Sequence, residues 1–379
     1  MLISAAGPGS VPVASPTGAA PTDFVPAPQA GDYPIPANPV VAVCGATGAV
    51  GRVMLETLER LDFPASRVRA LASARSAGTT IPYTGPGAPD SGQLTVEEMT
   101  PDSFQGVNIA LFSAGAAITK QFAADVNAAG AVIIDNSSAY RMDPEVPLVV
   151  PEVNPADAHR HNGIIANPNC STIQMVVALA PLVKLAPIRR VVVSTYQAAS
   201  GAGQAAMDEL YNQTGDFLAG RSFTPQAFAH QIAFNCIPQI DVFLPDGQTK
   251  EEWKMVVETK KILHNPDIQV NATCVRVPVL RSHSESVNVE FDAHAGKYVL
   301  SLSDVRAALA SAPGVVVIDD PEHLDYPMPA FTAGRDEVFV GRIRTDPTVE
   351  NGYQMWVVAD QLLKGAALNA VQIAQLLLP

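Results

Sequence analysis

The sequence predicts an α/β protein with two domains, a doubly wound parallel sheet followed by a second domain rich in strands. Two observations predict the first domain: an apolar run that opens into a glycine-rich turn, and alternation of strand and helix patterns through residue 135. Beyond residue 190, stretches dominated by β-branched residues predict further strands. A chain of 379 residues also exceeds what one compact core usually holds.

Composition excludes several classes of partner. Hydrophobic residues make up 47% and charged residues 16%, as in ordinary globular proteins, and the net charge of −13 argues against nucleic acid or an anionic membrane. The 4 cysteines have no paired spacing, so we expect neither disulfides nor a metal site. No apolar run approaches the roughly 18 residues that span a bilayer. These features predict a cytoplasmic protein.

The first 38 residues are rich in Pro, Ala and Gly, and the first basic residue is Arg52. A secretory signal or an organelle transit peptide would carry positive charge, so neither fits. We predict a mostly disordered tail over residues 1–38. The alternative is an arm packed along the surface.

A strand, a glycine turn and a helix follow the tail. Residues 39–44 are continuously apolar, residues 45–51 read GATGAVG, and a helical pattern begins near Val53. Glycines there let the backbone approach a pyrophosphate at the helix N-terminus, which predicts a dinucleotide-binding domain. The spacing is G-x-x-G-x-x-G, which is weak evidence without the flanking strand and helix.

The end of the second strand, residues 68–72, indicates which dinucleotide. An NAD site usually has an acidic residue here, but the following segment instead carries Ser73, Arg75 and Ser76. Guanidinium and hydroxyl donors suit a 2′-phosphate, so we predict NADP. The alternative is a solvated loop arginine.

Two more strand ends point to the same crevice. Residues 107–112 lead into Ser113, Ala114 and Gly115, and residues 131–135 lead into a loop that contains Arg141. Parallel sheets bind ligands at the carboxyl ends of their strands, so these residues are candidate ligand contacts. Arg141 could equally be an ordinary loop arginine.

Cys170 is the candidate nucleophile. An apolar run at 164–166 precedes Pro168 and Asn169, a preferred N-cap residue, so a helix is expected to begin at or just after Cys170. The helix N-terminus should lower the thiol pKa and favour the thiolate. The alternative is a small buried apolar cysteine.

The second domain supplies further candidates. Small residues at 198–203 follow a strand and could let a flat ring lie close to the backbone, and residues 251–263 form a helical pattern. Glu252 lies three and four residues before apolar positions, so we expect it to face the apolar side and to need a partner or ligand. Glu251 and Lys254 could be plain solvated charges. His283, between two predicted strands, is the best base candidate, although strand-end histidines are often structural.

Taken together, these segments resemble the aspartate-semialdehyde dehydrogenase family from about Val40 to Leu378. The matching pieces are GATGAVG at 45–51, SARSAG at 73–78, SAG at 113–115, DNSSAYRM at 135–142, NPNCST at 167–172, QAASGAG at 197–203, EEWKMVVETKKIL at 251–263, RVPVLRSH at 276–283 and KGAALNAVQIA at 364–374.

The resemblance implies a role for each matching residue. The catalytic residues would be Cys170 as nucleophile, His283 as acid/base and Gln197 to orient the substrate. The substrate contacts would be Arg276 for the α-carboxylate, Glu252 for the α-amino group, Arg141 and Lys254 for the acyl phosphate, and Asn169. The NADP contacts would be Gly45, Thr47, Gly48, Ala49, Val50, Gly51, Ser73, Arg75, Ser76, Ser113, Ala114, Gly115, Ser200, Gly201 and Gln361. Related sequences often have asparagine at position 361, which puts that contact in doubt.

The resemblance also implies a reaction, a fold class and an assembly. The reaction is the NADP-dependent interconversion of L-aspartyl 4-phosphate and L-aspartate 4-semialdehyde with inorganic phosphate, in lysine, threonine and methionine biosynthesis. The fold class is α/β, with a doubly wound parallel dinucleotide-binding domain (39–168 and 360–379) and an α+β catalytic and dimerisation domain with a mixed sheet (169–359). A homodimer or homotetramer is expected. The alternatives are a reductase of N-acetyl-glutamyl phosphate and a non-catalytic NADP-binding sensor.

Overall fold

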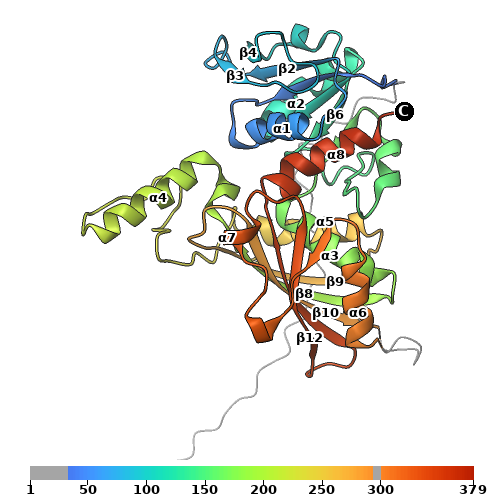
Figure 1. Ribbon diagram of the computed structural model, residues 1–379, viewed down its shortest axis with the longest axis vertical. Helices are drawn as coiled ribbons and strands as arrows, with labels where there is room; N and C mark the ends of the chain where they lie inside the picture. Colours follow the sequence, from blue (N-terminus) through green and yellow to red (C-terminus); the bar gives the residue numbers. More distant parts are fainter. Residues whose placement is uncertain (1–32, 293–299) are drawn as a thin grey trace, which may run out of the picture.

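A computed structural model of the protein describes residues 33–292 and 300–379 (Figure 1). Two sheet-based parts are stacked along the long axis, and helix α4 (Gln204–Leu218) projects sideways as an arm. Over the described residues, no helix is both long enough and apolar enough to cross a membrane.

The first sheet has 7 strands in the order β3-β4-β2-β1-β5-β6-β7. All neighbouring pairs are parallel except β3 with β4. The strand order reverses at β1, which has β2 on one side and β5 on the other, and this is where open α/β sheets form a ligand crevice. The strands are β1 (Val40–Cys44), β2 (Arg67–Ala72), β3 (Thr80–Pro82), β4 (Gln93–Glu98), β5 (Ile109–Phe112), β6 (Val132–Asp135) and β7 (Ile164–Ala166).

Strands β5, β6 and β7 are buried along their whole length, which shows that both faces of this part of the sheet are covered. Helix α1 (Ala49–Arg60) and helix α8 (Leu368–Leu376) share one apolar cluster with the sheet, and helix α2 (Ala116–Ala128) packs into the cluster on the other face. The predicted doubly wound parallel sheet is therefore confirmed.

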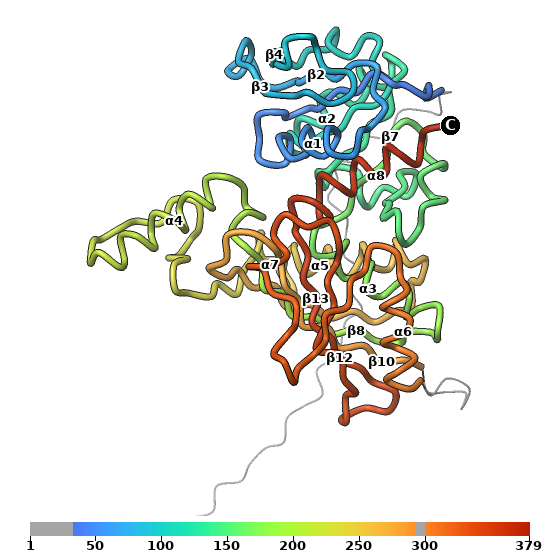
Figure 2. Tube along the Cα trace, in the orientation of Figure 1, coloured from blue at the N-terminus to red at the C-terminus, as the bar shows by residue number. Residues whose placement is uncertain are grey.

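The chain returns to the first domain at its C-terminal end. Figure 2 shows α8 lying beside α1, far from it in sequence. The sequence predicts one helix over 362–378, but residues Leu363–Ala367 form a π-helical turn, η5, before α8 begins. This turn lies next to the start of helix α3 (Cys170–Val183).

The second sheet has 6 strands in the order β11-β12-β13-β10-β8-β9, and it mixes parallel and antiparallel pairs, which confirms the predicted mixed sheet. Helices α3, α5 (Lys250–Ile262) and α6 (Leu302–Ala310) cover one face. Helix α3 is apolar all round, as expected for a helix buried between sheet and domain. The strands are β8 (Ile188–Gln197), β9 (Gln269–Arg276), β10 (His283–Phe291), β11 (Val315–Val317), β12 (Val338–Asp346) and β13 (Gly352–Ala359).

The remaining elements are short. They are helix α7 (Pro329–Thr332) and the 3-10 turns η1 (Pro101–Phe104), η2 (Pro155–Arg160), η3 (Ala199–Ala202) and η4 (Pro321–His323). Turn η3 directly follows β8 and contributes to the site described below.

The predicted tail is partly corrected. Residues 1–32 lie outside the described residues, so disorder there stays a prediction. Tyr33 and Ile35, however, pack against the core of the first domain, and the Tyr33 ring lies 5.8 Å from that of His161. Apolar side chains at both positions make the chain pack there, so the tail does not extend to residue 38. The division of the chain at residues 168 and 360 stays a prediction.

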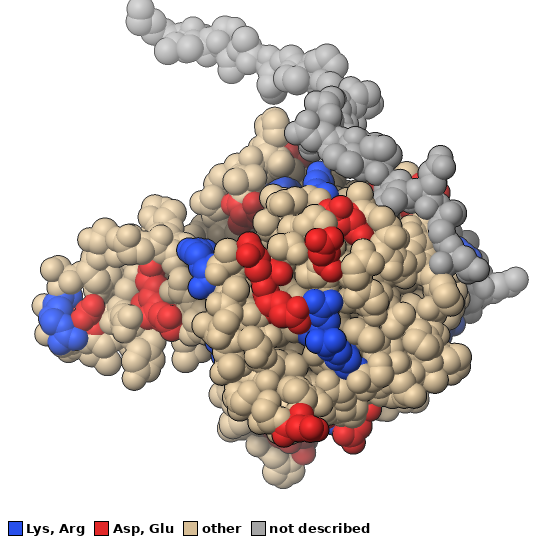
Figure 3. All heavy atoms as spheres, turned by 90° about the horizontal axis from the view of Figure 1, so that it is seen from above, with Lys and Arg blue, Asp and Glu red and all other residues tan. Residues whose placement is uncertain are grey.

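The face seen from above in Figure 3 carries acidic and basic side chains in small separate groups. On this face, the described residues therefore form no single basic patch that would match nucleic acid.

Candidate active site

A pocket of about 400 Å³ lies where the start of α3, turn η3, helix α5 and turn η5 meet. It brings together many of the residues singled out from the sequence. Those that line it are Val50, Arg141, Asn169, Cys170, Gln197, Ser200, Gly201, Lys254, Arg276 and Gln361.

Cys170 is the first residue of α3, as predicted. The side chain of Asn169 caps the helix, because its Oδ1 accepts hydrogen bonds from Ser171 N at 3.0 Å and Thr172 N at 3.2 Å. Cys170 is half-buried and lines the pocket. A sulfur in this position can meet a substrate from the pocket side.

The prediction of a lowered Cys170 pKa is wrong for this structure. Burial and then the Glu251 carboxylate raise the pKa of the Cys170 thiol to about 12, against the opposing charges of Arg276 and Arg141. The helix N-terminus supplies only a partial positive charge. It stabilises the thiolate less than burial destabilises it by removing the surrounding water. The thiol is therefore the resting form at neutral pH.

Glu252 does not reach the pocket, which corrects its predicted role as partner of the substrate amino group. Its carboxylate accepts hydrogen bonds from Thr249 N at 2.7 Å and Cys274 N at 3.0 Å. The Thr249 side chain in turn accepts from Glu252 N, so the two residues form a capping box at the start of α5. Glu252 does have the partner that its position demands, but that partner is backbone.

Glu251 lines the pocket instead, so the expectation of a solvated charge is wrong. It is 5% exposed, and its Oε1 accepts from Asn169 Nδ2 at 2.8 Å and Gln197 Nε2 at 3.3 Å. One residue along a helix changes the direction of a side chain by about 100°. The capping-box spacing from Thr249 to Glu252 is the sequence signal that could have separated the two glutamates.

Lys254 is also held inside the site and is not a freely solvated charge. Its Nζ donates to Asp241 Oδ2 at 2.8 Å and Glu251 Oε2 at 3.1 Å. Burial alone would lower the pKa of Lys254, but the Glu251 and Asp241 carboxylates outweigh burial and raise it. The side chain is therefore a cation at neutral pH. Asp241, which also lines the pocket, was not singled out from the sequence.

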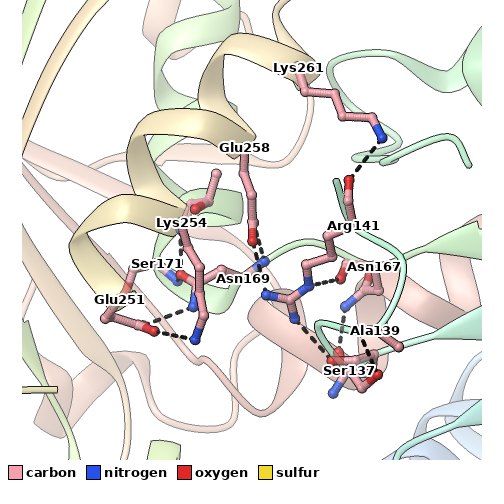
Figure 4. Close-up of polar contacts among 12 residues, drawn as sticks. Ser137, Ala139, Arg141, Asn167, Asn169, Ser171, Glu251, Lys254, Glu258 and Lys261 are labelled. Atoms are coloured by element: carbon pink, nitrogen blue, oxygen red, sulfur yellow. Dashed lines mark hydrogen bonds and ion pairs between the residues drawn. The ribbon is translucent and has the colours of Figure 1, made fainter. Parts of the chain in front are cut away.

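Arg141 is fixed by a buried carboxylate that sequence reasoning missed, Glu258 of α5 (Figure 4). Arg141 donates from Nη1 to Glu258 Oε1 at 3.1 Å, from Nε to Asn167 O at 2.9 Å and from Nη2 to Asn136 O at 3.0 Å. The second oxygen of Glu258 accepts from Asn169 N at 2.6 Å. Glu258 thus links the guanidinium to the residue that precedes the cysteine.

Burial raises the pKa of Glu258, while the Arg141 guanidinium and the Asn169 amide oppose that rise. Both carboxylate oxygens accept hydrogen bonds in the structure, and these bonds favour the ionised form against the effect of burial. One turn further along α5, Lys261 donates from Nζ to Arg141 O, Asp143 O and Val146 O, and so anchors the same loop.

Arg276 and Gln197 lie side by side, because they are paired residues of the parallel strands β9 and β8. Both are buried, and both face the pocket. Arg276 donates from Nη1 to Ala198 O at 2.7 Å, which orients the guanidinium.

His283 is fully buried and is not among the residues that line the pocket, but it neighbours two that are, Gly201 and Arg276. A Cβ built on Gly201 would lie 3.1 Å from His283 Nε2 and 2.9 Å from Arg276 Nη1, so a side chain at position 201 would crowd both groups. Ala198 N donates to His283 Nδ1 at 3.0 Å, so the neutral ring carries its proton on Nε2. Burial, followed by the Arg276 charge, lowers the pKa of His283 well below its usual value.

The predicted dinucleotide loops meet at the reversal of strand order. Gly45 has φ +87°, and a Cβ on it would lie 2.7 Å from Ser113 O; a Cβ on Gly51 would lie 2.1 Å from Gly45 O. The first loop therefore packs so tightly that only glycine fits at both positions. The first turn of α1 carries no acidic residue, which leaves its N-terminus suited to a pyrophosphate.

The residues predicted to bind the 2′-phosphate lie beside this loop. Thr47 Oγ1 donates to Ser76 Oγ at 3.4 Å, which joins the two loops. Ser73 and Arg75 are exposed, and Arg75 forms no ion pair with a residue that the structure describes. These groups fit a nicotinamide dinucleotide with an additional phosphate. Gln361 lies at the pocket and bonds to Ser282 and Ser200.

Two family models match the chain. The model described as semialdehyde dehydrogenase, NAD binding domain, matches residues 40–161, and semialdehyde dehydrogenase, dimerisation domain, matches residues 179–364. A curated relative named aspartate-semialdehyde dehydrogenase, from Bacillus subtilis (strain 168), is 53% identical over 342 residues, which cover 88% of this chain and 96% of that protein.

Two solved structures resemble the fold. A crystal structure of aspartate semialdehyde dehydrogenase II from Vibrio cholerae, complexed with ASA, has a TM-score of 0.84 at 46% identity and covers 90% of this chain and 98% of its own. Aspartate semialdehyde dehydrogenase with NADP from Candida albicans has a TM-score of 0.68 at 26% identity over 90% and 98%. The chain belongs to the aspartate-semialdehyde dehydrogenase family, and it is an oxidoreductase of amino-acid biosynthesis.

Proposed function

We propose that the protein converts L-aspartyl 4-phosphate to L-aspartate 4-semialdehyde with NADPH, through a thioester on Cys170. The observation that carries this proposal is the position of Cys170 at the start of α3, in a pocket that also holds Arg276, Glu251, Arg141 and Lys254. The Vibrio cholerae relative is described with ASA bound, which supports the same substrate here.

Arg276 and Glu251 suit the two charged groups of the aspartyl moiety. A guanidinium can bind a carboxylate through two parallel hydrogen bonds, and Arg276 is already oriented by Ala198 O. Glu251 is the carboxylate that lines the pocket, so we assign it, in place of Glu252, to the substrate α-ammonium. A free ammonium next to a buried carboxylate distinguishes this substrate from one with an acylated amine.

Arg141 and Lys254 suit the acyl phosphate. Three donors of Arg141 are occupied by Asn167 O, Asn136 O and Glu258, which fixes the plane of the guanidinium and leaves further N–H groups for a ligand. Lys254 adds a second positive charge from α5. Together they would neutralise the phosphate before it leaves.

Cys170 would attack the acyl carbon as the thiolate, forming the S–C bond while the C–O bond to phosphate breaks; the thiol proton passes to the departing oxygen, and inorganic phosphate leaves. Ionisation of the thiol is the costly prerequisite, because burial holds its pKa near 12. The charges of Arg276 and Arg141 and the Ser171 N–H favour the thiolate, and they are the groups that lower this cost.

NADP would be held by the Gly45–Gly51 loop, by Ser73, Arg75 and Ser76, and by Ser200 and Gly201 near its nicotinamide. When bound, NADPH supplies the hydride that reduces the thioester carbonyl. His283 would donate its Nε2–H to the oxygen formed there, and when that oxygen returns to a carbonyl the S–C bond breaks, releasing the semialdehyde and the Cys170 thiolate. The Candida albicans relative, described with NADP, supports this choice of dinucleotide.

We further propose a homodimer or a homotetramer built on the face of the second sheet that α3, α5 and α6 leave uncovered. Tyr196 and Trp356 lie on neighbouring parts of this sheet with ring centroids 5.3 Å apart, and Tyr196 is partly exposed. The matched dimerisation-domain model covers both residues. A cytoplasmic location stays a prediction.

The decisive assay is reduction of NADP by L-aspartate 4-semialdehyde in the presence of phosphate. We expect activity that depends on phosphate, and we expect Cys170→Ala to abolish turnover while NADP binding, measured by fluorescence, is retained. Activity in Cys170→Ala would exclude the covalent mechanism. Faster turnover of the N-acetyl-glutamyl substrate than of the aspartyl substrate would exclude the assignment of Glu251.

A further inference from the structure

We propose that Gln361 is a positioning residue that holds the backbone before His283 and the turn η3 in one fixed arrangement. The proposal rests on the function proposed above, in which His283 and η3 serve the reacting carbonyl and the nicotinamide. It assigns Gln361 a task within the protein itself, in addition to any contact with a dinucleotide.

Gln361 bridges the segment that ends at Ser282 and the turn η3. Its Oε1 accepts a hydrogen bond from Ser282 N at 2.8 Å, and its Nε2 donates to Ser200 Oγ. The side chain is buried and lines the pocket. The oxygen of the carboxamide therefore binds the segment before His283, and its nitrogen binds turn η3.

Ser282 is held in a conformation that serine rarely adopts. Its φ is +76°, in the left-handed region, and the residue is fully buried directly before His283. A non-glycine residue in this region is strained relative to its preferred conformations, because its Cβ crowds the neighbouring backbone. Such strain persists only where neighbouring groups enforce it, and the bond from Ser282 N to Gln361 is one such constraint.

Asp360, the residue before Gln361, also holds the segment that precedes His283 (residues 277–282, called the strap below). Asp360 is fully buried and accepts hydrogen bonds from Arg281 Nε at 2.6 Å, Gly334 N at 2.6 Å and Leu362 N at 3.0 Å. Asp360 thus binds Arg281, and Gln361 binds the next residue, Ser282. The position of His283 is set by this pair of contacts as well as by its own strand.

Turn η3 is joined to the same strap through backbone. Ala199 N donates to Val279 O at 2.8 Å, and Ser200 N donates to Leu280 O at 3.1 Å. Ala198 N donates to the His283 ring itself. Gln361 adds the side-chain bond to Ser200, so a shift of the strap would move η3 and the imidazole together.

The position of Gln361 in the chain shows which parts of the molecule it connects. It stands between β13 of the second sheet and α8, which packs on the first sheet. Gln361 therefore places His283 relative to the segment that crosses between the two sheets. Loss of the bridge should disturb the chemical step more than binding of the semialdehyde, whose proposed contacts are Arg276 and Glu251.

The test compares Gln361→Ala, Ser282→Gly and the double variant in the semialdehyde oxidation assay. Gln361→Ala should lower kcat about tenfold or more, with the KM for semialdehyde changed less than about twofold, because it leaves a buried N–H unpaired and releases a strained residue. Glycine adopts positive φ freely, so the double variant should recover roughly fivefold of the lost kcat. Ser282→Gly alone should retain wild-type kcat.

Gln213→Ala is the matched control. The buried carboxamide of Gln213 in the arm accepts hydrogen bonds from Ile232 N at 2.9 Å and Ala233 N at 3.2 Å, and none of these three residues lines the pocket. This variant should lower Tm and leave kcat unchanged. An equal loss of kcat in Gln213→Ala would overturn the proposal, as would a double variant no faster than Gln361→Ala.

A second readout does not depend on the reaction. In protein labelled with 15N-histidine, the ring nitrogen shifts of His283 should move in Gln361→Ala and return in the double variant. Unchanged shifts in Gln361→Ala would overturn the positioning role. A wild-type enzyme inactive with semialdehyde, yet showing these shifts, would instead refute the proposed function alone.

Discussion

Gly365 lies against Cys170 so closely that a Cβ built on Gly365 would be 2.8 Å from the Cβ of Cys170 and 3.2 Å from its Cα. Real Cβ atoms do not approach to 2.8 Å, so any side chain at position 365 must displace Cys170 or the π-helical turn. The glycine is thus part of the wall that sets where the sulfur sits.

Gly365→Ala should therefore lower kcat/KM for semialdehyde by about 100-fold, the loss expected when a reacting group moves by about 1 Å. The comparison variant is Gly215→Ala in α4, where an added Cβ meets nothing within 4 Å. Steady-state kinetics on both variants check the prediction. Wild-type kinetics in Gly365→Ala would show that Cys170 tolerates displacement.

Glu251→Gln and Glu252→Gln make the same chemical change at adjacent residues of α5. Glu251→Gln should lower kcat/KM by about 10- to 100-fold, because it removes a charged partner from the pocket. Glu252→Gln should stay near wild type, since glutamine also completes a capping box with Thr249. The reverse order of effects in the semialdehyde assay would restore the role first predicted for Glu252.

The Cys170 thiol should alkylate slowly at neutral pH, and its rate with iodoacetamide should still rise with pH above the usual thiol pKa of about 8.5, because burial and Glu251 raise the pKa of Cys170 to about 12. Removing the Glu251 charge lowers that pKa, so Glu251→Gln should alkylate faster than wild type at the same pH while turning over more slowly. Site-resolved mass spectrometry measures the rate, with the exposed Cys236 as internal reference. A rate that levels off below pH 7 would contradict the raised pKa.

Glu258→Gln should raise the KM for phosphate about tenfold in the oxidative direction. The amide can accept from Asn169 N or from Arg141, but not from both, so Arg141 loses its fixed orientation. Removing one member of a buried ion pair should also lower Tm. The KM for semialdehyde should change much less. An unchanged KM for phosphate would show that Glu258 does not orient Arg141 for phosphate binding.

Arg276→Lys should reduce kcat/KM by about 100-fold or more, even though lysine keeps the positive charge. Lysine cannot keep the bond to Ala198 O and also present two parallel donors to a carboxylate. Arg189→Lys is the surface control, because Arg189 is half exposed in an ion pair with Glu290. Steady-state kinetics near wild type in Arg276→Lys would refute the bidentate clamp.

The features that depend on local sequence were predicted well. Asn169 and Pro168 fix where α3 begins, and the apolar run before Gly45 fixes β1, because caps and buried strands have strong local signals. The Glu252 prediction failed on the orientation of one side chain, although the capping residue Thr249 held the information.

Features that depend on tertiary packing could not be predicted from one stretch of chain. The pKa of Cys170 is decided by burial under turn η5 and by Glu251, which is distant in sequence. Glu258 reads as an ordinary helical glutamate until Arg141 and Asn169 are brought to it. The placement of His283 next to Gly201 likewise requires β8 and β10 to be paired.

The return of the chain through η5 and α8 also bears on how the protein is made. Gly365 and Gln361 leave the ribosome long after Cys170, so a nascent chain can complete neither the wall beside the sulfur nor the strap before the imidazole. The sheet that binds the dinucleotide likewise lacks one of its covering helices until then. The pocket is therefore complete only once the C-terminal segment has folded back onto the first sheet.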